Sequence, residues 1–267
     1  MAGNTKALRV RIKSVTSTLQ LTKAMGLVAS SKIRRANEAM FNAREYLETL
    51  NNAISLLTCD RESLKSPYMR NDSDSRTRII VIAGDRGLAG GYNANVFRLA
   101  NTFSDAEFIP IGKRACERFS KEIVSSERFS FNDALNLADE QCKDFCDEKF
   151  DRLGVIYTKY HSVMSQEAEI KWILPLERSE NNNSGGTVFE PDHLTVLNNA
   201  VREYVAGTLT AAIRESFASE VSARRMAMDS AGKNAKQMID DLALEYNRAR
   251  QGAITQEITE IVAGSGN

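Results

Sequence analysis

The chain has 267 residues, of which 42% are hydrophobic, and its 35 basic side chains balance its 35 acidic ones. This composition is typical of a globular protein with one or two domains. The sequence contains no apolar run long enough to span a membrane, and no apolar segment near the N-terminus, which argues against secretion.

The N-terminal segment, residues 1 to 66, is predicted to form one long helix. Its apolar residues recur at alternating steps of four and three for about seven heptads, which favours a coiled coil over a globular surface helix. Thr22 and Gly26 are the weak positions of this seam. Because the seam begins by Leu8, we expect no cleavable presequence. The seam consists of Leu8, Ile12, Val15, Leu19, Thr22, Gly26, Ala29, Ile33, Ala36, Met40, Ala43, Leu47, Leu50, Ile54 and Leu57.

The balanced net charge hides a basic N-terminal end. Residues 1 to 44 carry nine Lys and Arg side chains against Glu38 alone, a net charge of +8. Such an end should favour an acidic partner, either nucleic acid or an acidic loop of a protein. Aromatic residues do not alternate with the basic ones, which argues against a base-stacking surface. A nucleic-acid-binding helical arm and a merely solvated helix face both stay open as interpretations.

The middle of the chain, residues 67 to 191, alternates between predicted strands and helices and contains all four prolines. This alternation predicts a small α/β domain. A polar hinge at 71–78 precedes the first strand, and a loop rich in Asn, Ser and Gly lies at 179–186. Asn132 or Asp133 is expected to cap the third helix. Strands are expected at 78–83, 107–112, 123–131, 152–161 and 167–176, and helices at 93–101, 113–121 and 133–150.

A glycine loop, Gly84 to Gly91, connects the first strand of this domain to its first helix, as in a Rossmann-like unit. A phosphate-binding P-loop needs a lysine and a hydroxyl after its last glycine, and here Gly91 and Tyr92 follow Gly90; the spacing also differs from a dinucleotide fingerprint. We therefore interpret the glycines as positions for a tight turn and close backbone packing, and we expect no cofactor. A nucleotide-binding enzyme is the rival interpretation of this domain.

The cysteines and histidines indicate neither a metal site nor catalysis. Cys142 and Cys146 fall on one helix face, where a disulfide is geometrically poor, so buried thiols are expected. No Ser-His-Asp, Cys-His or paired-carboxylate set stands out. The residues without metal-ligand spacing are Cys59, Cys116, Cys142, Cys146, His161 and His193. We predict that the chain is not an enzyme.

The C-terminal segment, residues 192 to 267, lacks proline and is predicted to be one unbroken helix. From Val196 to Ala263 it would be roughly 100 Å long, whereas a compact globule of this chain length is under about 50 Å wide. It should therefore project and pair with the N-terminal helix. The fold class is α/β plus long helices, with an antiparallel coiled coil of the two ends and an inserted Rossmann-like domain. The expected apolar stripe is Val201, Val205, Leu209, Ile213, Phe217, Val221, Met228, Ala231, Ala235, Met238, Leu242, Tyr246, Ala249 and Ala253.

Three stretches resemble the gamma subunit of F-type ATP synthase. They are Leu21 to Lys32 (LTKAMGLVASSK), Gly84 to Gly91 (GDRGLAGG) and Tyr246 to Val262 (YNRARQGAITQEITEIV), in the order of that family. The resemblance implies a coiled coil that serves as the central rotor shaft, and an α/β foot at the membrane end. The shaft would transmit torque between the proton-driven c ring and the catalytic alpha/beta hexamer without making or breaking bonds itself.

The resemblance also implies contacts with the beta subunit. Arg224, Gln251 and Thr255 match positions that hold beta-subunit loops, and Met25 matches a methionine that faces an acidic beta-subunit loop. Without the motif, Arg224 and Gln251 would be interpreted as the flank of a coiled coil.

Two further surfaces follow from the same resemblance. Phe189 and Glu190 match a short segment that contacts the c ring. An apolar tip would suit a bearing, because a sliding surface should have no directional bonds to break. That tip consists of Ile254, Ile258, Ile261 and Val262.

The implied partners are the alpha and beta subunits, the epsilon subunit and the c ring, with no nucleic acid and with the membrane reached only through the c ring. Ala89 stands where the family's turn has a cysteine, so thiol chemistry is not expected there. The regulatory insert and transit peptide of chloroplast members are absent. We therefore expect a bacterial subunit, peripheral on the cytoplasmic face of the cell membrane.

Overall fold

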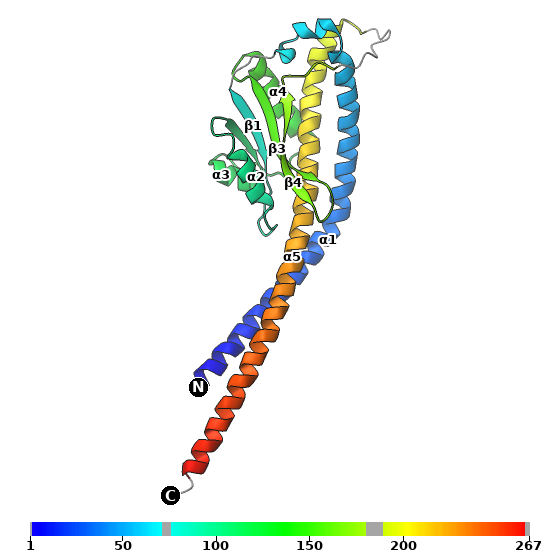
Figure 1. The fold of residues 1–267 in the computed structure, drawn as a ribbon. Helices are drawn as coiled ribbons and strands as arrows, with labels where there is room; N and C mark the ends of the chain where they lie inside the picture. The colour runs from blue at the N-terminus through cyan, green and yellow to red at the C-terminus, as the bar shows by residue number, and fades with distance from the viewer. Residues whose placement is uncertain (1, 71–75, 180–188, 265–267) are drawn as a thin grey trace. The chain divides into compact units, whose positions relative to one another are not determined.

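The computed structural model describes residues 2–70, 76–179 and 189–264 (Figure 1). It divides into two compact units, one made of Met1–Ser30 with Arg224–Asn267 and the other of Ser31–Ala223. We call them the two-helix unit and the α/β unit. Helix α1 (Ala2–Thr58) and helix α5 (His193–Gly264) contribute to both units.

The α/β unit is built on a four-stranded sheet in the order β2-β1-β3-β4. Strand β1 (Thr77–Ile82) lies between two parallel neighbours, β2 (Glu107–Ile111) and β3 (Arg152–Tyr160). Strand β4 (Gln166–Leu174) pairs antiparallel with β3 at the edge. The predicted Rossmann-like domain is thus confirmed, with an antiparallel last strand as expected for a sheet closed by a strand pair.

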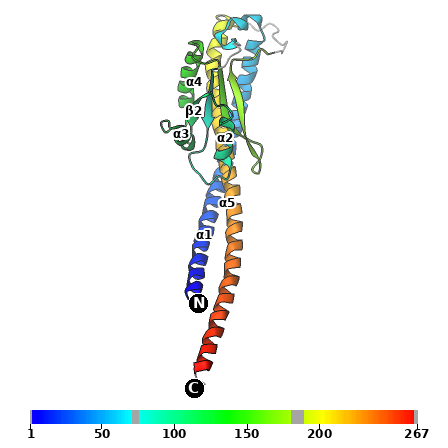
Figure 2. The same cartoon turned by 60° about the vertical axis from the view of Figure 1, so that its left-hand side comes forward.

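Helices cover both faces of this sheet, as Figures 1 and 2 show. Ile79 and Val81 point to the face covered by α2 (Tyr92–Ala100) and α3 (Lys113–Phe119). Ile80 and Ile82 point to the opposite face, where the core contains α4 (Phe131–Cys146) and the long helices. All four of these β1 side chains are 0% exposed, which explains why β1 is a continuous apolar run rather than an alternating one.

Helix α1 has the predicted seam but ends earlier than predicted. Every seam residue is buried or half-buried, whereas its neighbours on the other faces are mostly exposed. The helix ends at Thr58 rather than at residue 66, because the chain turns into two short 3-10 helices, η1 (Arg61–Lys65) and η2 (Pro67–Met69). The Asp60 side chain caps the first of them by accepting a hydrogen bond from the backbone N–H of Glu62.

Helix α5 is a single helix of 72 residues, as predicted from the absence of proline. In the α/β unit its stripe residues Val201, Val205, Leu209, Ile213 and Val221 are buried. The prediction was wrong at Met238, which is 44% exposed. Ile239 is half-buried in its place, because the stripe there advances by four residues instead of three, as the 3.6-residue period of a helix requires.

The central domain differs from the prediction in two further places. Residues 123–131 are not a strand: the carbonyl of Val124 accepts the N–H of Gly112, and the segment then turns into α4. Helix α4 is capped by Ser130, whose side chain and that of Asp133 form a reciprocal capping box. The predicted hinge at 71–78 and loop at 179–186 lie largely outside the described residues.

Candidate functional site

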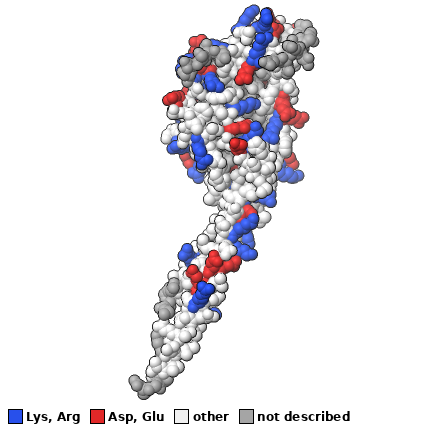
Figure 3. All heavy atoms as spheres, in the orientation of Figure 1, with Lys and Arg blue, Asp and Glu red and all other residues white. Residues whose placement is uncertain are grey.

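The C-terminal end of α5, in the two-helix unit, exposes apolar side chains. Ile254 is 48% exposed, Ile258 is 56% exposed, and Ile261 and Val262 are each 65% exposed. A Cβ placed on Gly264 would meet no described atom within 4 Å. Figures 1 and 2 show that α5 continues past the start of α1, so the end of the longer helix has no helix beside it. On the face shown in Figure 3, the described surface near the C-terminus is uncharged.

The four predicted beta-subunit contacts fall into two sets. Gly26 faces Met228, with 3.6 Å between the Met228 Cβ and a Cβ placed on the glycine, and this antiparallel register puts Met25 and Arg224 on the same stretch of the helix pair. Both side chains are half-buried. Gln251 and Thr255 are exposed and lie 27 residues or more along α5 from Arg224, which is about 40 Å. The structure does not bring the two sets together.

In the set of Gln251 and Thr255, the Thr255 side chain is hydrogen-bonded to the backbone of its own helix. Its hydroxyl donates to the carbonyl of Gln251 at 2.9 Å, and its own carbonyl accepts the hydroxyl of Thr259 at 2.8 Å. The hydroxyl oxygen keeps lone pairs with which it can accept a further bond. Gln251 offers both a donor and an acceptor from an exposed side chain, so the pair presents hydrogen-bonding groups without a charge.

A groove of about 490 Å³ lies between α1 and α5 in the two-helix unit. It exists because small residues meet across the seam: a Cβ on Gly232 would lie 3.6 Å from the Thr22 hydroxyl oxygen. Thr22 and Gly26, the weak seam positions of the sequence, are thus the floor of a groove. Sequence reasoning missed this groove because it could not align Thr22 with Gly232 or Gly26 with Met228. Its charged lining consists of Lys23, Arg225, Asp229, Lys233 and Lys236.

Phe189 and Glu190 lie in the α/β unit, at the start of α5. The Phe189 ring packs edge-on against His193, with ring centroids 5.1 Å apart, and contacts the main core. Glu190 is exposed. The Asp192 carboxylate accepts hydrogen bonds from the hydroxyl and from the backbone N–H of Thr195. These bonds hold the pKa of Asp192 below its usual value. Phe189 is therefore anchored while Glu190 is presented outward.

The glycine loop is folded against the protein itself. The N–H of Gly84 donates to the Asn93 side chain at 3.0 Å, and a Cβ on Gly84 would lie 2.7 Å from the buried Glu220 carboxyl group. Gly90 has a φ of 60°, which favours glycine. The interpretation of these glycines as turn and close-packing positions is thus confirmed for Gly84 and Gly90.

The acidic residue of that loop organises the loops around it. Asp85 accepts the backbone N–H groups of Lys113 and Ser126, both at 3.0 Å, and that of Glu127 at 3.3 Å. It also accepts the hydroxyl of Ser125. Partial burial opposes ionisation, but these hydrogen bonds hold the pKa of Asp85 below its usual value. The role of Asp85 is structural and was not foreseen from the sequence.

Part of the basic N-terminal end is neutralised within the chain. Lys32 pairs with Glu127 at 2.8 Å, and Arg44 pairs with Glu215 at 2.5 Å. Arg34 lies 3.9 Å from Glu38 on the same helix. Among the described residues, at least three of the nine basic side chains therefore have a carboxylate partner.

The cysteines are free, and the expectation of buried thiols on the helix face of Cys142 and Cys146 is confirmed for Cys142 but wrong for Cys146. Cys116 and Cys142 are buried, Cys59 is half-buried and Cys146 is exposed. Burial raises the pKa of Cys142 to about 12. Among the described side chains, no group of three or more His, Cys, Asp or Glu is placed to hold a metal ion. Within the same residues, no helix combines the length and apolar composition needed to cross a membrane.

Comparison with known proteins gives consistent matches. Residues 4–266 match the family described as ATP synthase. A protein named ATP synthase gamma chain from Ruminococcus albus is 41% identical over 99% of both chains. Proteins of the same name from Geotalea daltonii and Staphylococcus epidermidis are 34% and 35% identical over 97% of both chains.

Solved structures share the fold at lower identity. A chain of the Euglena gracilis mitochondrial ATP synthase OSCP/F1/c-ring structure has a TM-score of 0.71 at 18% identity, over 99% of this chain and 94% of that one. A chain of the Tetrahymena thermophila mitochondrial ATP synthase central stalk and c ring has a TM-score of 0.61 at 21% identity, over 79% and 99%.

Proposed function

Because the chain belongs to the family of ATP synthase gamma chains, we propose that it is the central rotor shaft of a bacterial ATP synthase. It would transmit torque between the c ring and the catalytic alpha/beta hexamer during ATP synthesis or hydrolysis, as a non-catalytic subunit. The observation that carries this proposal is the match to a gamma chain at 41% identity over 99% of both chains. The family assignment leaves the nucleic-acid alternative without support.

In this proposal residues 1–66 and 192–267 form the shaft and residues 67–191 form the foot. The shaft meets beta-subunit loops through Met25, Arg224, Gln251 and Thr255. The separation of about 40 Å between Arg224 and Gln251 along α5 supports contacts with two different levels of the hexamer. Gly26, the residue after Met25, lines a groove with four cationic side chains, which favours an acidic partner loop there.

The apolar tip of Ile254, Ile258, Ile261 and Val262 is proposed to turn in a sleeve of the hexamer. Spacings of four, three and one put these side chains on one broad face of α5, and each is about half or more exposed. Apolar contacts have no direction, so they can be exchanged as the shaft turns without a hydrogen bond being broken at each angle. A polar tip would create such angle-dependent barriers.

The foot is proposed to contact the epsilon subunit and the c ring, and to reach the c ring through Phe189 and Glu190. The anchored ring and the outward carboxylate support a contact in which Phe189 sets the position and Glu190 meets the partner. The subunit would then be peripheral, on the cytoplasmic face of the bacterial cell membrane, and linked to the membrane only through the c ring.

Affinity purification tests the proposal. A tagged copy of this chain, expressed in its own cells, should carry with it an alternating hexamer that hydrolyses ATP. A matched copy that ends at residue 223 keeps the α/β unit and lacks the C-terminal part of the two-helix unit, and it should recover little or no hexamer. Recovery of nucleic acid without ATPase subunits would overturn the proposal.

A further inference from the structure

Four polar residues of α5 that lie outside its predicted apolar stripe are buried together in the α/β unit. Glu215, Ser216, Ser219 and Glu220 are each 6% exposed or less. Buried polar side chains on a helix are costly unless each finds a hydrogen-bond partner. The partners here are mainly backbone groups of the sheet, which indicates a built connection between the helix and the sheet.

The partner is the free end of strand β3. Its ladder with β1 ends at the pair Val81 and Ile156, while its pairing with β4 continues to Tyr160. From Thr158 onward, the backbone groups of β3 that face away from β4 thus have no strand beside them. Unpaired backbone groups in a buried position would be strongly unfavourable.

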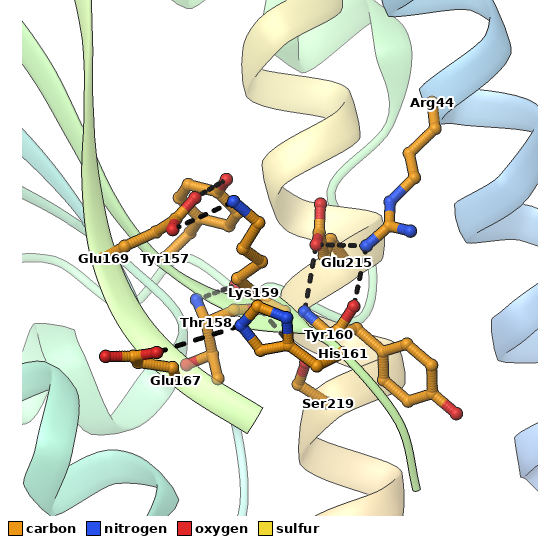
Figure 4. A network of polar contacts seen from close by, with 11 residues as sticks. Arg44, Tyr157, Thr158, Lys159, Tyr160, His161, Glu167, Glu169, Glu215 and Ser219 are labelled. Atoms are coloured by element: carbon orange, nitrogen blue, oxygen red, sulfur yellow. Dashed lines mark hydrogen bonds and ion pairs between the residues drawn. The ribbon is translucent and has the colours of Figure 1, made fainter. Parts of the chain in front are cut away.

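Side chains of the two long helices replace the missing strand (Figure 4). At Thr158, the N–H donates to the Ser216 hydroxyl and the carbonyl accepts the Ser219 hydroxyl, both at 3.1 Å. At Tyr160, the N–H donates to Glu215 and the carbonyl accepts Arg44, both at 2.9 Å. Both donors and both acceptors at these two positions are therefore satisfied from outside the sheet.

A salt bridge ties the two helices together at the same point. Arg44 of α1 lies 2.5 Å from Glu215 of α5, whose side chain is 8% exposed. The same carboxylate oxygen accepts the N–H of Tyr160. Charge-assisted hydrogen bonds are about twice as strong as neutral ones, and here one carboxylate joins α1, α5 and β3. Tyr92 adds a further link, because its hydroxyl donates to the carbonyl of Ser216 at 3.1 Å.

We propose that Arg44, Glu215, Ser216 and Ser219 form the joint through which the α/β domain grips the long helices and passes torque to them. This inference rests on the proposed shaft function. A torque applied at the foot must reach α5 without slack, and directional bonds to a strand backbone resist sliding and rotation in a way that apolar packing does not. The joint residues are positioning residues for torque transfer, with no part in the chemistry of ATP.

The first test measures the joint in the isolated full-length chain. Glu215→Gln keeps the shape of the side chain and removes its charge. The amides of Thr158 and Tyr160 should then exchange about tenfold faster or more with deuterated water, while the amide of Ile80 in β1 keeps its rate. Arg202→Gln is the control, because it breaks an exposed ion pair between α5 and Asp139 of α4. Unchanged exchange at both joint amides would overturn the joint.

The second test measures how freely the α/β domain rotates relative to a fixed hexamer in the assembled complex. A probe is attached at Met164→Cys, an 80% exposed position in the turn between β3 and β4, with Cys59→Ser and Cys146→Ser to prevent other labelling. With the hexamer fixed and nucleotide removed, the angular variance of single probes should increase in Glu215→Gln and stay at the parental level in Arg202→Gln. Only assembled molecules are counted, so a mere loss of stability does not move this readout.

The outcomes separate the two proposals. Faster exchange with unchanged angular variance would mean that these residues only stabilise the fold, which overturns the torque role. If Glu215→Gln fails to fold, Ser219→Ala is measured in the same way, and unchanged variance there overturns the role too. If the parental chain neither assembles with a hexamer nor rotates, the shaft function itself fails, although the exchange measurement still reports on the joint.

Discussion

Replacing Met40 by alanine should destabilise the α/β unit markedly. Met40 is 0% exposed and packs in a cluster with Ala36 and Ala218, between α1 and α5. Two of its neighbours are alanines, whose side chains are too short to fill the space that Met40→Ala leaves. Met→Ala changes in such sites cost about 2–5 kcal/mol through lost burial and an unfilled cavity. We expect about 3 kcal/mol for this chain.

The assay is thermal unfolding of the isolated chain, followed by circular dichroism. For a unit of this size, each kcal/mol shifts the midpoint by about 2–4 °C, so Met40→Ala should lower it by about 6–12 °C. Phe41→Ala is the matched control, since the adjacent Phe41 is 57% exposed and its loss should cost no more than about 0.5 kcal/mol. Equal midpoints for the two variants would refute the pairing of α1 with α5 at this seam position.

Three further predictions concern the loops and the shaft. Gly112→Ala should lower the free energy of unfolding by at least about 2 kcal/mol, because Gly112 has a φ of 100° and an added Cβ would overlap the Ala83 carbonyl. Gly87→Ala is the control, since its Cβ would meet only Arg114 at 3.6 Å. Equal denaturation midpoints for the two variants would contradict the reasoning. Asp85 has a pKa below its ordinary value of 3.8, so its ionised form stabilises the fold fully above that pH, and this stabilisation is lost as the pH falls through the lower, folded-state pKa. The difference in unfolding free energy between the parent and Asp85→Asn should therefore shrink on acidification below about pH 4. A difference independent of pH would exclude this role. Arg224→Ala or Gln251→Ala should lower steady-state ATP turnover of the assembled complex by roughly ten- to a hundredfold, with normal subunit stoichiometry on a gel. Removal of residues 261–267 should lower turnover less. Normal turnover in both point variants would remove these contacts from the proposal.

Local periodicity explains why so much of the fold could be predicted. The seam of α1 could be predicted because each buried position follows from the one before it by a step of three or four. The prediction failed at Met238, where a strict continuation of that step no longer matches the helical period. It failed again at 123–131, because the apolar residues of that segment are held by single backbone bonds, such as that between Gly112 and Val124, rather than by a ladder.

The joint and the groove could not be predicted for a different reason. Glu215 and Ser219 look like solvent-facing residues in a helical pattern, and their partners are backbone atoms of β3 that no pattern in α5 identifies. The groove needs Gly26 to face Met228 and Gly232 to face Thr22, and that register depends on the pairing of two segments about 200 residues apart. Features that join distant segments through backbone atoms or small residues leave no periodic signal.

The surroundings of α5 change along its length in a way that matches three different tasks. In the α/β unit it is buried among apolar residues and held to β3 by directional hydrogen bonds. In the two-helix unit only one stripe is covered, by α1. At Ile258 and beyond, the described side chains are exposed. Directional bonds suit a part that must not slip, and a bare apolar end suits a part that must. Each Ile of that tip would gain about 1.5–3 kcal/mol on full burial, so the tip can be held firmly by a partner while no bond fixes its angle. A helix with the reverse order would have only apolar contacts at the foot, where torque enters, and hydrogen bonds at the tip, where they would oppose rotation.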